Sequence, residues 1–248
     1  MNDAKTVFNI ELAGVPVEIK CRHPYNKIFL QDYLTDKEPL FTVEPSQADL
    51  DKILKEFEAT AQSEGRKTEE YSEVFLENNA IHALLAENLV DYSVLLMHGS
   101  AIALDGEAYI FTAKSGTGKS THARLWRKHF GERAFMINDD KPMLKVTDGG
   151  VWVYGTPWNG KHRLSQNTSA PLKAIVYLTR DTENHIEPLK KADVFPVIFK
   201  QAYYSENSDK LRKILQMENE IMRIVKCYKL GCNMNPNAAT IAWEGMNS

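Results

Sequence analysis

The chain opens with apolar and polar residues in alternation, the pattern of β-strands that have one buried face. The alternating apolar positions are Phe8, Ile10, Leu12, Val15, Val17 and Ile19. The pair Ala13-Gly14 separates the two runs and is typical of a turn. Residues 7–20 are therefore predicted to form a β-hairpin.

Helical spacing replaces the alternation further along the chain. Ser46 and Asp49 have the spacing of a capping box and predict the start of a helix that ends near Phe57. The buried stripe of that helix would be Leu50, Ile53, Leu54 and Phe57. The polar residues 62–72 are predicted to be a linker, and a second helix is expected from Glu73 to about Val90.

From Val94 onward, short apolar runs separated by polar loops predict a sheet with helices. Strands are expected at 94–98, 101–104, 108–112, 134–138, 143–146, 151–154 and 174–178. Helical or amphipathic segments are expected at 119–129, 193–203 (bent at Pro196) and 209–225, with a short helix from about Pro236. Asp148-Gly149-Gly150 is a hairpin signal, which favours an α/β (α+β) fold with a mixed sheet over a fully parallel one.

Composition limits the functional classes. With 248 residues, 43% hydrophobic and 25% charged, the chain is typical of a globular protein. A net charge of −3 gives no electrostatic footprint for nucleic acid or for an acidic membrane surface. Three cysteines without a C-x-x-C pair favour a reducing compartment. The start, MNDAKTVFNIEL, has no signal-peptide pattern, and no apolar run is long enough to span a bilayer. We expect a cytoplasmic protein.

The segment 108–126, AYIFTAKSGTGKSTHARLW, carries the strongest chemical signal. An apolar strand runs into a glycine-bearing loop that opens onto a helix, which is the context of a phosphate-binding loop. Lys119 would reach the β- and γ-phosphates, and the Ser120 hydroxyl would bind Mg²⁺. Ala113 stands where a glycine is usual, so a positive φ there would be unfavourable. The nucleotide-binding residues are predicted to be Ser115, Gly116, Thr117, Gly118, Lys119, Ser120 and Thr121. The alternative is a surface loop that precedes a helix by chance.

Two adjacent carboxylates follow the strand at 134–138. Asp139 and Asp140 stand where a phosphate-loop enzyme needs an acid for its metal. Because successive strand side chains point in opposite directions, one acid can serve the metal while the other acts as a base. Asp-Asp-Lys-Pro is also good turn chemistry, so a solvated turn is the alternative interpretation. His98, after the apolar run VLLM, is by itself more typical of a structural histidine.

Three motifs together suggest a family. HGSAI (98–102), AKSGTGKS (113–120) and INDDKP (137–142) resemble HPr kinase/phosphorylase in order and spacing. With YGTPWNGK (154–161), the chain is most similar to the HPr-kinase-related proteins of bacterial peptide-modification clusters. The resemblance covers about residues 90–248 and implies a kinase domain with the fold shared by HPr kinase and phosphoenolpyruvate carboxykinase. Residues 1–89 would form a separate N-terminal α+β region.

The resemblance also implies roles for residues. Lys119 and Ser120 match the phosphate and magnesium residues, Asp140 matches the general base, Asp139 its neighbour near the metal, and His98 the histidine beside the base. ATP and Mg²⁺ are the implied cofactors. A serine or threonine of a peptide or small protein is the implied acceptor. The resemblance also allows a homo-oligomer, because HPr kinase is a hexamer. Thr121 stands where HPr kinase has glutamate, and TPWNGK replaces its later signature segment.

The segment 156–161, TPWNGK, offers further candidates. Gly160 would let the backbone approach a phosphate, and Lys161 would supply a second positive charge as a catalytic residue. Alternatively, Trp158 packs in the core and Lys161 is solvated. Two other functions stay open: an ATP-binding sensor or scaffold without transfer, and a carboxykinase-type or metabolite kinase that uses Arg163 and Arg180 as carboxylate clamps.

Overall fold

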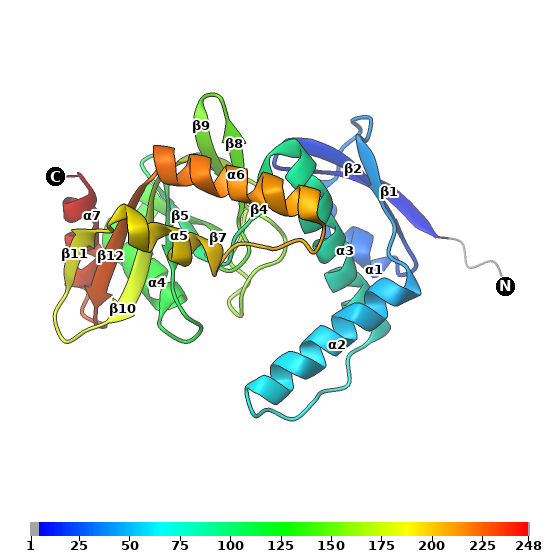
Figure 1. Cartoon of the computed structure of the whole chain (residues 1–248), viewed down its shortest axis with the longest axis horizontal. Coiled ribbons are helices and arrows are strands. Elements are labelled where there is room, and N and C mark those ends of the chain that lie inside the picture. Colours follow the sequence, from blue (N-terminus) through cyan, green and yellow to red (C-terminus); the bar gives the residue numbers. More distant parts are fainter. Residues whose placement is uncertain (1–4, 248) are drawn as a thin grey trace. The chain divides into compact units, whose positions relative to one another are not determined.

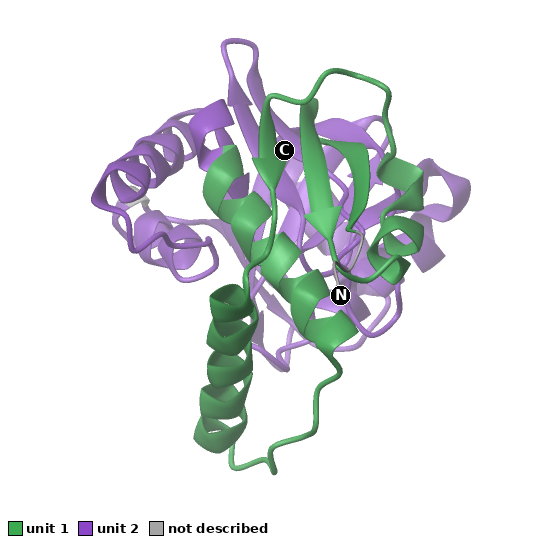
Figure 2. Cartoon of the chain, turned by 90° about the vertical axis from the view of Figure 1, so that its right-hand side faces the viewer, with its two compact units in different colours: residues 1–89 green, residues 90–248 purple. Residues whose placement is uncertain are grey.

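The computed structural model describes residues 5–247, and its elements are labelled in Figure 1. Residues 1–4, the start of the segment without a signal-peptide pattern, and residue 248 lie outside the described part. The chain divides into two compact units, Met1–Leu89 and Val90–Ser248, which are green and purple in Figure 2. None of the described helices combines the length and apolar character needed to cross a bilayer.

The first unit contains a three-stranded sheet in the order β1-β2-β3. Its strands are β1 (Thr6–Leu12), β2 (Val15–Cys21) and β3 (Phe41–Val43). β1 and β2 are antiparallel, whereas β3 runs parallel to β2. Ala13 and Gly14 both have positive φ, 50° and 70°, as a type I′ turn requires. The predicted hairpin and its turn are confirmed.

Three α-helices complete the first unit: α1 (Tyr25–Phe29), α2 (Gln47–Ser63) and α3 (Glu73–Leu89). The predicted capping box is confirmed, because Ser46 and Asp49 each accept the other's backbone N–H at the start of α2. α2 extends beyond its predicted end at Phe57. Residues 62–72 therefore contain the last residues of α2 together with its connection to α3.

Glu77 is a fully buried carboxylate of α3 in this unit. Its oxygens accept the backbone N–H groups of Arg22 and His23 at 2.6 and 3.0 Å, and the side-chain amide of Asn26 at 2.8 Å. The His23 ring lies 2.9 Å from the same carboxylate. A buried carboxylate needs such partners to offset its desolvation. Glu77 thus fixes the turn between β2 and α1.

The second unit is built on a nine-stranded sheet with the path β4-β8-β9-β10-β6-β5-β7, in which β12 pairs with β10 and β11. The strands are β4 (Val94–Leu96), β5 (Ser100–Leu104), β6 (Glu107–Thr112), β7 (Ala134–Asn138), β8 (Met143–Thr147), β9 (Gly150–Tyr154), β10 (Ser169–Arg180), β11 (His185–Pro188) and β12 (Lys226–Cys232). β10 is parallel to β6 and β12, and the other pairs are antiparallel. The predicted mixed α/β sheet is confirmed.

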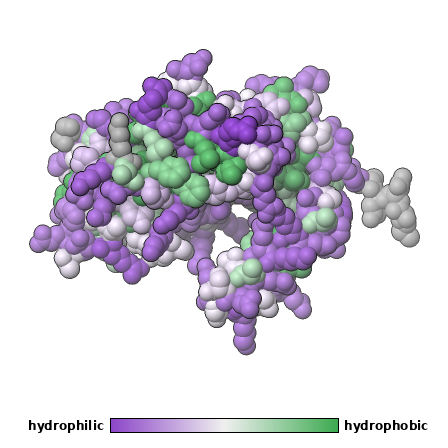
Figure 3. Space-filling model, viewed as in Figure 1, coloured by the Kyte–Doolittle hydropathy of each residue, from purple (hydrophilic) through white to green (hydrophobic). Residues whose placement is uncertain are grey.

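Helices pack against the sheet of the second unit in two hydrophobic clusters. They are α4 (Lys119–Phe130), α5 (Lys191–Phe199), α6 (Ser208–Ile224) and α7 (Asn237–Asn247). Trp126 of α4 and Ala242 of α7 share one cluster with strand residues, and Ile198 of α5 and Ile214 of α6 share the other. Apolar surface remains over α5 and α6 (Figure 3), where Phe199 is among the exposed residues.

Strand directions bring several loops to one edge of this sheet. β6, β10 and β12 run parallel, so their carboxyl ends lie together. β5 is antiparallel to both β6 and β7. The carboxyl end of β7 and the beginning of β5 therefore lie at the same edge as the carboxyl end of β6. In sheets of this kind, ligands bind outside the carboxyl ends of the strands.

Candidate functional site

Residues 113–118 form a loop between β6 and α4, as the phosphate-loop motif requires. Gly116 and Gly118 have φ of 74° and 122°, a region that favours glycine. Ala113 is fully buried and is not among the described residues with positive φ. The expected strain at Ala113 is therefore absent, since its methyl group packs in the core in an ordinary backbone conformation.

The backbone N–H groups at the start of α4 have no side-chain cap from Gly118 and no acidic residue in the first turn. Lys119 places a cation there instead, and its Nζ donates to the carbonyl oxygen of Ala113 at 3.4 Å. Burial lowers the pKa of Lys119, against an opposing effect of Asp140. Unbonded N–H groups at a helix start, together with a lysine, are suited to an anion.

The other predicted loop residues surround this helix start. Ser115 and Gly116 are exposed, and Thr117, Gly118, Ser120 and Thr121 are partly exposed. The loop is closed by a hydrogen bond from the Thr117 N–H to the Lys114 carbonyl at 3.2 Å. Solvent can therefore reach the predicted nucleotide-binding residues.

Asp140 and His98 form the contact at the centre of the site. His98 Nε2 lies 3.2 Å from Asp140 Oδ1, and both side chains are about one-third exposed. Burial by itself would raise the pKa of Asp140, but the His98 hydrogen bond and the charges of Lys141, His98 and Lys119 together lower it. The carboxylate is therefore ionised at neutral pH. The positive charge of Lys119 is one of the causes that lower this pKa.

Asp139 faces a different partner. Its side chain is 4% exposed, and Oδ1 accepts the backbone N–H of Gly160 at 2.6 Å. A Cβ at Gly160 would lie only 3.1 Å from that oxygen, so a glycine allows the close approach. Burial raises the pKa of Asp139, and the Gly160 hydrogen bond opposes the increase. Asp139 Oδ2 is buried without a hydrogen-bond partner. The two acids, which follow the end of β7, thus contact different partners.

Asn138 connects the acidic pair to the segment 156–161. Its Oδ1 accepts the N–H groups of Asp140 and Lys141 at 2.8 and 2.6 Å, and its Nδ2 donates to the carbonyl oxygens of Thr156 and Trp158 at 2.9 and 3.0 Å. The side chain is fully buried. Asn138 therefore sets the backbone position of Asp140 relative to Trp158. Its only sequence signal is its place immediately before the two aspartates.

Thr156 also connects the segment 156–161 to the residues that follow the acidic pair. Its hydroxyl donates to the Lys141 carbonyl at 2.8 Å, and the residue is fully buried. The preceding Gly155 has no room for a side chain, because a Cβ would lie 1.9 Å from the Gln166 carbonyl oxygen. Residues 155–166 therefore fold tightly over the carboxyl end of β7. We did not predict Asn138 or Thr156 as site residues.

Lys161 is placed differently from the other predicted catalytic residues. It is exposed, and it makes no hydrogen bond or ion pair with any described residue. Trp158 is 7% exposed and packs in the interior. Arg163 is exposed, and its backbone N–H donates to the Gly160 carbonyl at 2.9 Å. The structure thus brings Gly160, not Lys161, into contact with the acidic pair.

A cavity of about 390 Å³ lies beside the loop. It is lined by Gly116, Thr117, Gly118, Thr121, His122, Leu125, Arg180, Asp181, Cys232, Asn233 and Met234. Arg180, at the end of β10, donates from Nη2 to the Gly116 carbonyl at 2.6 Å. His122 is buried and accepts the indole N–H of Trp126 at 3.0 Å, and burial lowers its pKa to about 3. The cavity therefore has a neutral histidine in its wall and an arginine at the loop.

The possible ligands of a metal ion in the candidate site are Ser120 and Asp139. No group of three or more His, Cys, Asp or Glu residues in the described part of the chain could hold a metal ion. Mg²⁺ in nucleotide sites needs only one or two protein ligands, because phosphates and water complete its shell. The unpartnered Oδ2 of Asp139 and the accessible Ser120 hydroxyl are oxygen donors of the kind that Mg²⁺ prefers. The residues present fit a magnesium ion that arrives with a nucleotide.

Comparison with known proteins places the chain in a family. The family described as SynChlorMet cassette protein ScmC matches residues 65–233, which is more than half of the chain. The chain belongs to the ScmC family. The ScmC match includes the whole segment from His98 to Lys161, which contains most of the candidate site. None of the curated proteins matches this ScmC-family chain.

One solved structure shows a remote similarity to this ScmC-family member. It is the HPr(Ser) kinase/phosphatase from Coxiella burnetii, with 11% sequence identity and a TM-score of 0.34. The match covers 60% of this chain and 95% of that one.

Proposed function

We propose that the protein transfers the γ-phosphoryl group of Mg·ATP to a hydroxyl acceptor. The observation that carries this proposal is the juxtaposition at one sheet edge of two groups. One is the uncapped start of α4 with Lys119, and the other is the ionised Asp140 beside His98. The charges of Lys119 and Asp140 interact. Phosphoryl transfer requires an anion site together with a carboxylate that can orient the acceptor.

The loop would hold the nucleotide. The N–H groups at the start of α4 and the Lys119 ammonium would bind the β- and γ-phosphates. The cavity beside the loop would take the nucleoside, with Leu125 and Met234 as apolar contacts and Arg180 fixing the loop at Gly116. This assignment is supported by the cavity's position at the carboxyl ends of β10 and β12.

Magnesium would be held by the Ser120 hydroxyl and by Asp139 Oδ2, together with phosphate oxygens and water. A bound Mg²⁺ would neutralise phosphate charge as it develops during transfer. Gly160 keeps Asp139 in place through its N–H, so the backbone of the segment 156–161 supports the metal side of the site.

Asp140 would orient the acceptor hydroxyl and accept its proton. A carboxylate with a lowered pKa is a weak base, so the proton moves late, when the bond to phosphorus is largely formed. His98 fixes the carboxylate through the 3.2 Å contact. Lys161, exposed and close in sequence to Gly160, would contact the transferring group only when substrates are bound.

The acceptor we propose is a serine or threonine of a peptide or small protein. Support comes from the three motifs that resemble HPr kinase, HGSAI, AKSGTGKS and INDDKP. We also propose that the protein forms a homo-oligomer.

Transfer is tested with ATP labelled on its γ-phosphate and Mg²⁺. The acceptors are degenerate peptide mixtures with a fixed serine or threonine, and free serine and glycerol represent small hydroxyl compounds. We expect label on peptides with the wild type, and labelling slower by about 10²–10⁴-fold with Asp140→Asn. Label on serine or glycerol alone would favour the metabolite kinase. Bound ATP without label on any acceptor would favour the sensor.

A further inference from the structure

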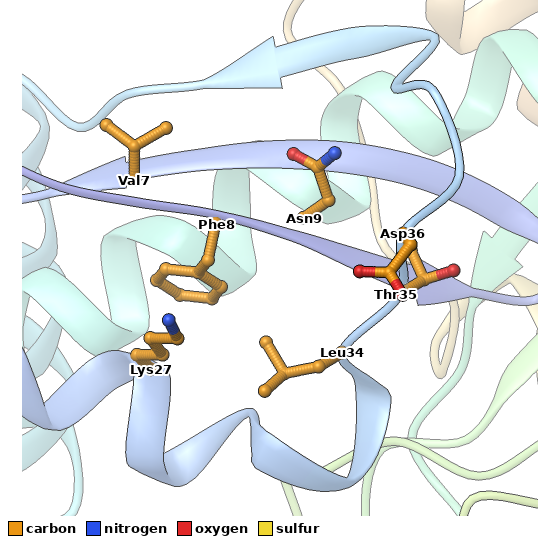
Figure 4. A pocket seen from close by; sticks show the side chains of 7 residues that line it. All are labelled: Val7, Phe8, Asn9, Lys27, Leu34, Thr35 and Asp36. Carbon is orange, nitrogen blue, oxygen red and sulfur yellow. The ribbon is translucent and has the colours of Figure 1, made fainter.

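A second cavity, of about 530 Å³, lies within the first unit (Figure 4). It is lined by Val7, Phe8, Asn9, Lys27, Leu34, Thr35 and Asp36. These residues come from β1, from α1 and from the segment that follows α1. In Figure 4, Phe8 points to the side of Lys27 and Leu34, whereas Val7 and Asn9 point to the other side of the strand. The cavity therefore runs along one edge of β1.

The backbone of β1 is partly unpaired at that edge. Glu11 lies opposite Pro16, which has no N–H, so odd-numbered residues of β1 direct their N–H and C=O groups away from β2. Asn9 fits this assignment, because its carbonyl accepts the Thr35 N–H at 3.1 Å. Neither backbone group of Val7 has a partner among the described residues. The edge is thus covered at Asn9 and open at Val7.

Apolar side chains accompany the open edge. Val7 and Leu34, which line the cavity, are 50% and 44% exposed. α1, which contributes Lys27 to the cavity, also carries Tyr25 and Ile28, and both are more than half exposed. Proteins usually protect edge strands with charge, proline or a covering segment. An open edge with exposed apolar residues beside a cavity is what strand addition of a peptide uses.

Charge indicates the kind of peptide. Residues 1–89 contain nine Lys and Arg against seventeen Asp and Glu, a net charge of −8, whereas the whole chain carries −3. At the cavity, Asp36 is exposed and has no partner among the described residues, while nearby Lys37 is already paired with Glu11 at 2.6 Å. Lys27 can donate to peptide carbonyl groups. An acidic unit attracts a basic segment.

We propose that the open edge of β1 and the adjoining cavity bind an extended, basic peptide segment by strand addition. The peptide backbone would pair with Val7, and one apolar side chain would enter the cavity against Phe8 and Leu34. Asp36 would bind a lysine or arginine of the peptide. This site does not rest on phosphoryl transfer, and it would recruit a peptide whether or not the second unit modifies it.

The test uses the full chain and the probe peptide Lys-Val-Thr-Val-Lys-Val-Thr-Val-Lys, followed by nuclear magnetic resonance. We expect saturable shifts of residues that line the cavity and slower hydrogen exchange at the Val7 amide. A probe with alternate amides N-methylated, which cannot pair along its length, should bind at least about tenfold more weakly. A probe with glutamate in place of lysine should lose a comparable part of its affinity.

Variants provide the matched control. Leu34→Lys places a charge at the cavity and should weaken binding by about tenfold or more. Leu40→Lys changes a more exposed leucine that does not line the cavity, and it should change binding less than about twofold.

Three results would overturn the proposal. They are no saturable shifts at millimolar probe, equal binding by the normal and N-methylated probes, or equal effects of the two substitutions. A doubling of molecular mass that closes the Val7 edge without the probe would identify a second copy of the chain as the occupant and would also reject the peptide.

Discussion

Two helices of the second unit begin in opposite ways. At the start of α6, the Asn207 side chain accepts the N–H groups of Asp209 and Lys210, and Asp209 adds a negative charge to the first turn. At the start of α4, Gly118 gives no cap and Lys119 adds a positive charge. Caps and first-turn acids stabilise helices by about 0.5–2 and 0.3–1 kcal/mol, respectively. α4 lacks both contributions.

The two helices therefore differ in whether their first backbone N–H groups are satisfied within the chain. α6 satisfies its own N–H groups and serves the fold, with a buried face that includes Ile214 and Ile221. α4 leaves its N–H groups open at the sheet edge that also holds Asp140. An open helix start is unfavourable without a ligand and favourable with an anion. We therefore expect substitutions at the start of α4 to change ligand affinity and substitutions in α6 to change stability.

The largest effect is expected at Asp140. Asp140→Asn removes the group that would accept the proton but keeps its size, so transfer should fall by about 10²–10⁴-fold with ATP affinity nearly unchanged. Asp148→Asn, in the exposed hairpin turn between β8 and β9, is the control and should leave both unchanged. Rates and calorimetric affinities measure the two effects. Transfer by Asp140→Asn at the wild-type rate would reject the assigned base.

A reciprocal exchange of residues between the two helix starts tests whether they differ in their effects on ATP binding and stability. Ser120→Asp and Asp209→Ser alter the second residue of α4 and of α6. Ser120→Asp should stabilise α4 by a few tenths of a kcal/mol and weaken ATP binding by about tenfold or more, because the new carboxylate repels phosphate. Asp209→Ser should slightly lower stability and leave ATP binding unchanged. Thermal unfolding and ATP titration of both variants measure these effects. Unchanged ATP affinity in Ser120→Asp would show that the start of α4 does not bind an anion.

Glu218 of α6 should make the stability of the fold depend on pH. Burial raises its pKa to about 7, with an opposing hydrogen bond from Tyr204. The folded pKa is above the unfolded value, so the contribution of Glu218 to stability is full below about pH 4.5 and is lost as the pH rises through about 7. Glu218→Gln should therefore reduce the fall in Tm between about pH 5.5 and 8.5 by a few degrees.

Circular dichroism at the two pH values measures that change in Tm. Glu220→Gln, a half-exposed neighbour on the same helix, should keep the wild-type pH dependence. The same pH dependence in Glu218→Gln and the wild type would show that Glu218 does not titrate in this range.

The smallest effect is expected at the α6 cap. Asn207→Ala removes the side-chain oxygen that accepts two N–H groups and should lower the free energy of unfolding by about 1 kcal/mol. ATP affinity should not change. Denaturant unfolding measures the loss, and a change in ATP affinity without a loss of stability would contradict the division between the two helices.

Local signals were sufficient for much of the fold. The hairpin β1–β2, the capping box of α2 and the helix α4 follow from alternation, cap spacing and glycine position, which act over a few residues. The turn at 148–150 also predicted the antiparallel pair β8–β9 and hence the mixed sheet. These features depend on neighbours in sequence, and that is why a pattern can reveal them.

Other elements lacked such signals. β12 begins two residues after α6 ends. The predicted segment 209–225 gave the end of α6, but no strand was predicted after it. β3 and β11 are three and four residues long and depend on β2 and β12 for pairing. α1 has only five residues, too few for a periodic pattern. Such segments are determined by tertiary contacts.

The site shows the same division. The order of motifs placed His98, Lys119 and Asp140 among the candidates, but the hydrogen bonds of Asn138 to Thr156 and Trp158 join residues 18 and 20 positions apart. An asparagine before two aspartates has no distinctive pattern by itself. Only the pairing of β5 with β7 and the fold of residues 155–166 reveal its role.

We expect the open start of α4 to bind the phosphates of ATP. Titration calorimetry with ATP, with and without Mg²⁺, on the wild type and on Lys119→Ala tests it most directly. We expect magnesium-dependent binding by the wild type and a loss of affinity of about 100-fold or more in Lys119→Ala, with both proteins folded by circular dichroism. Equal affinities of the two proteins, or no binding by the folded wild type, would contradict it.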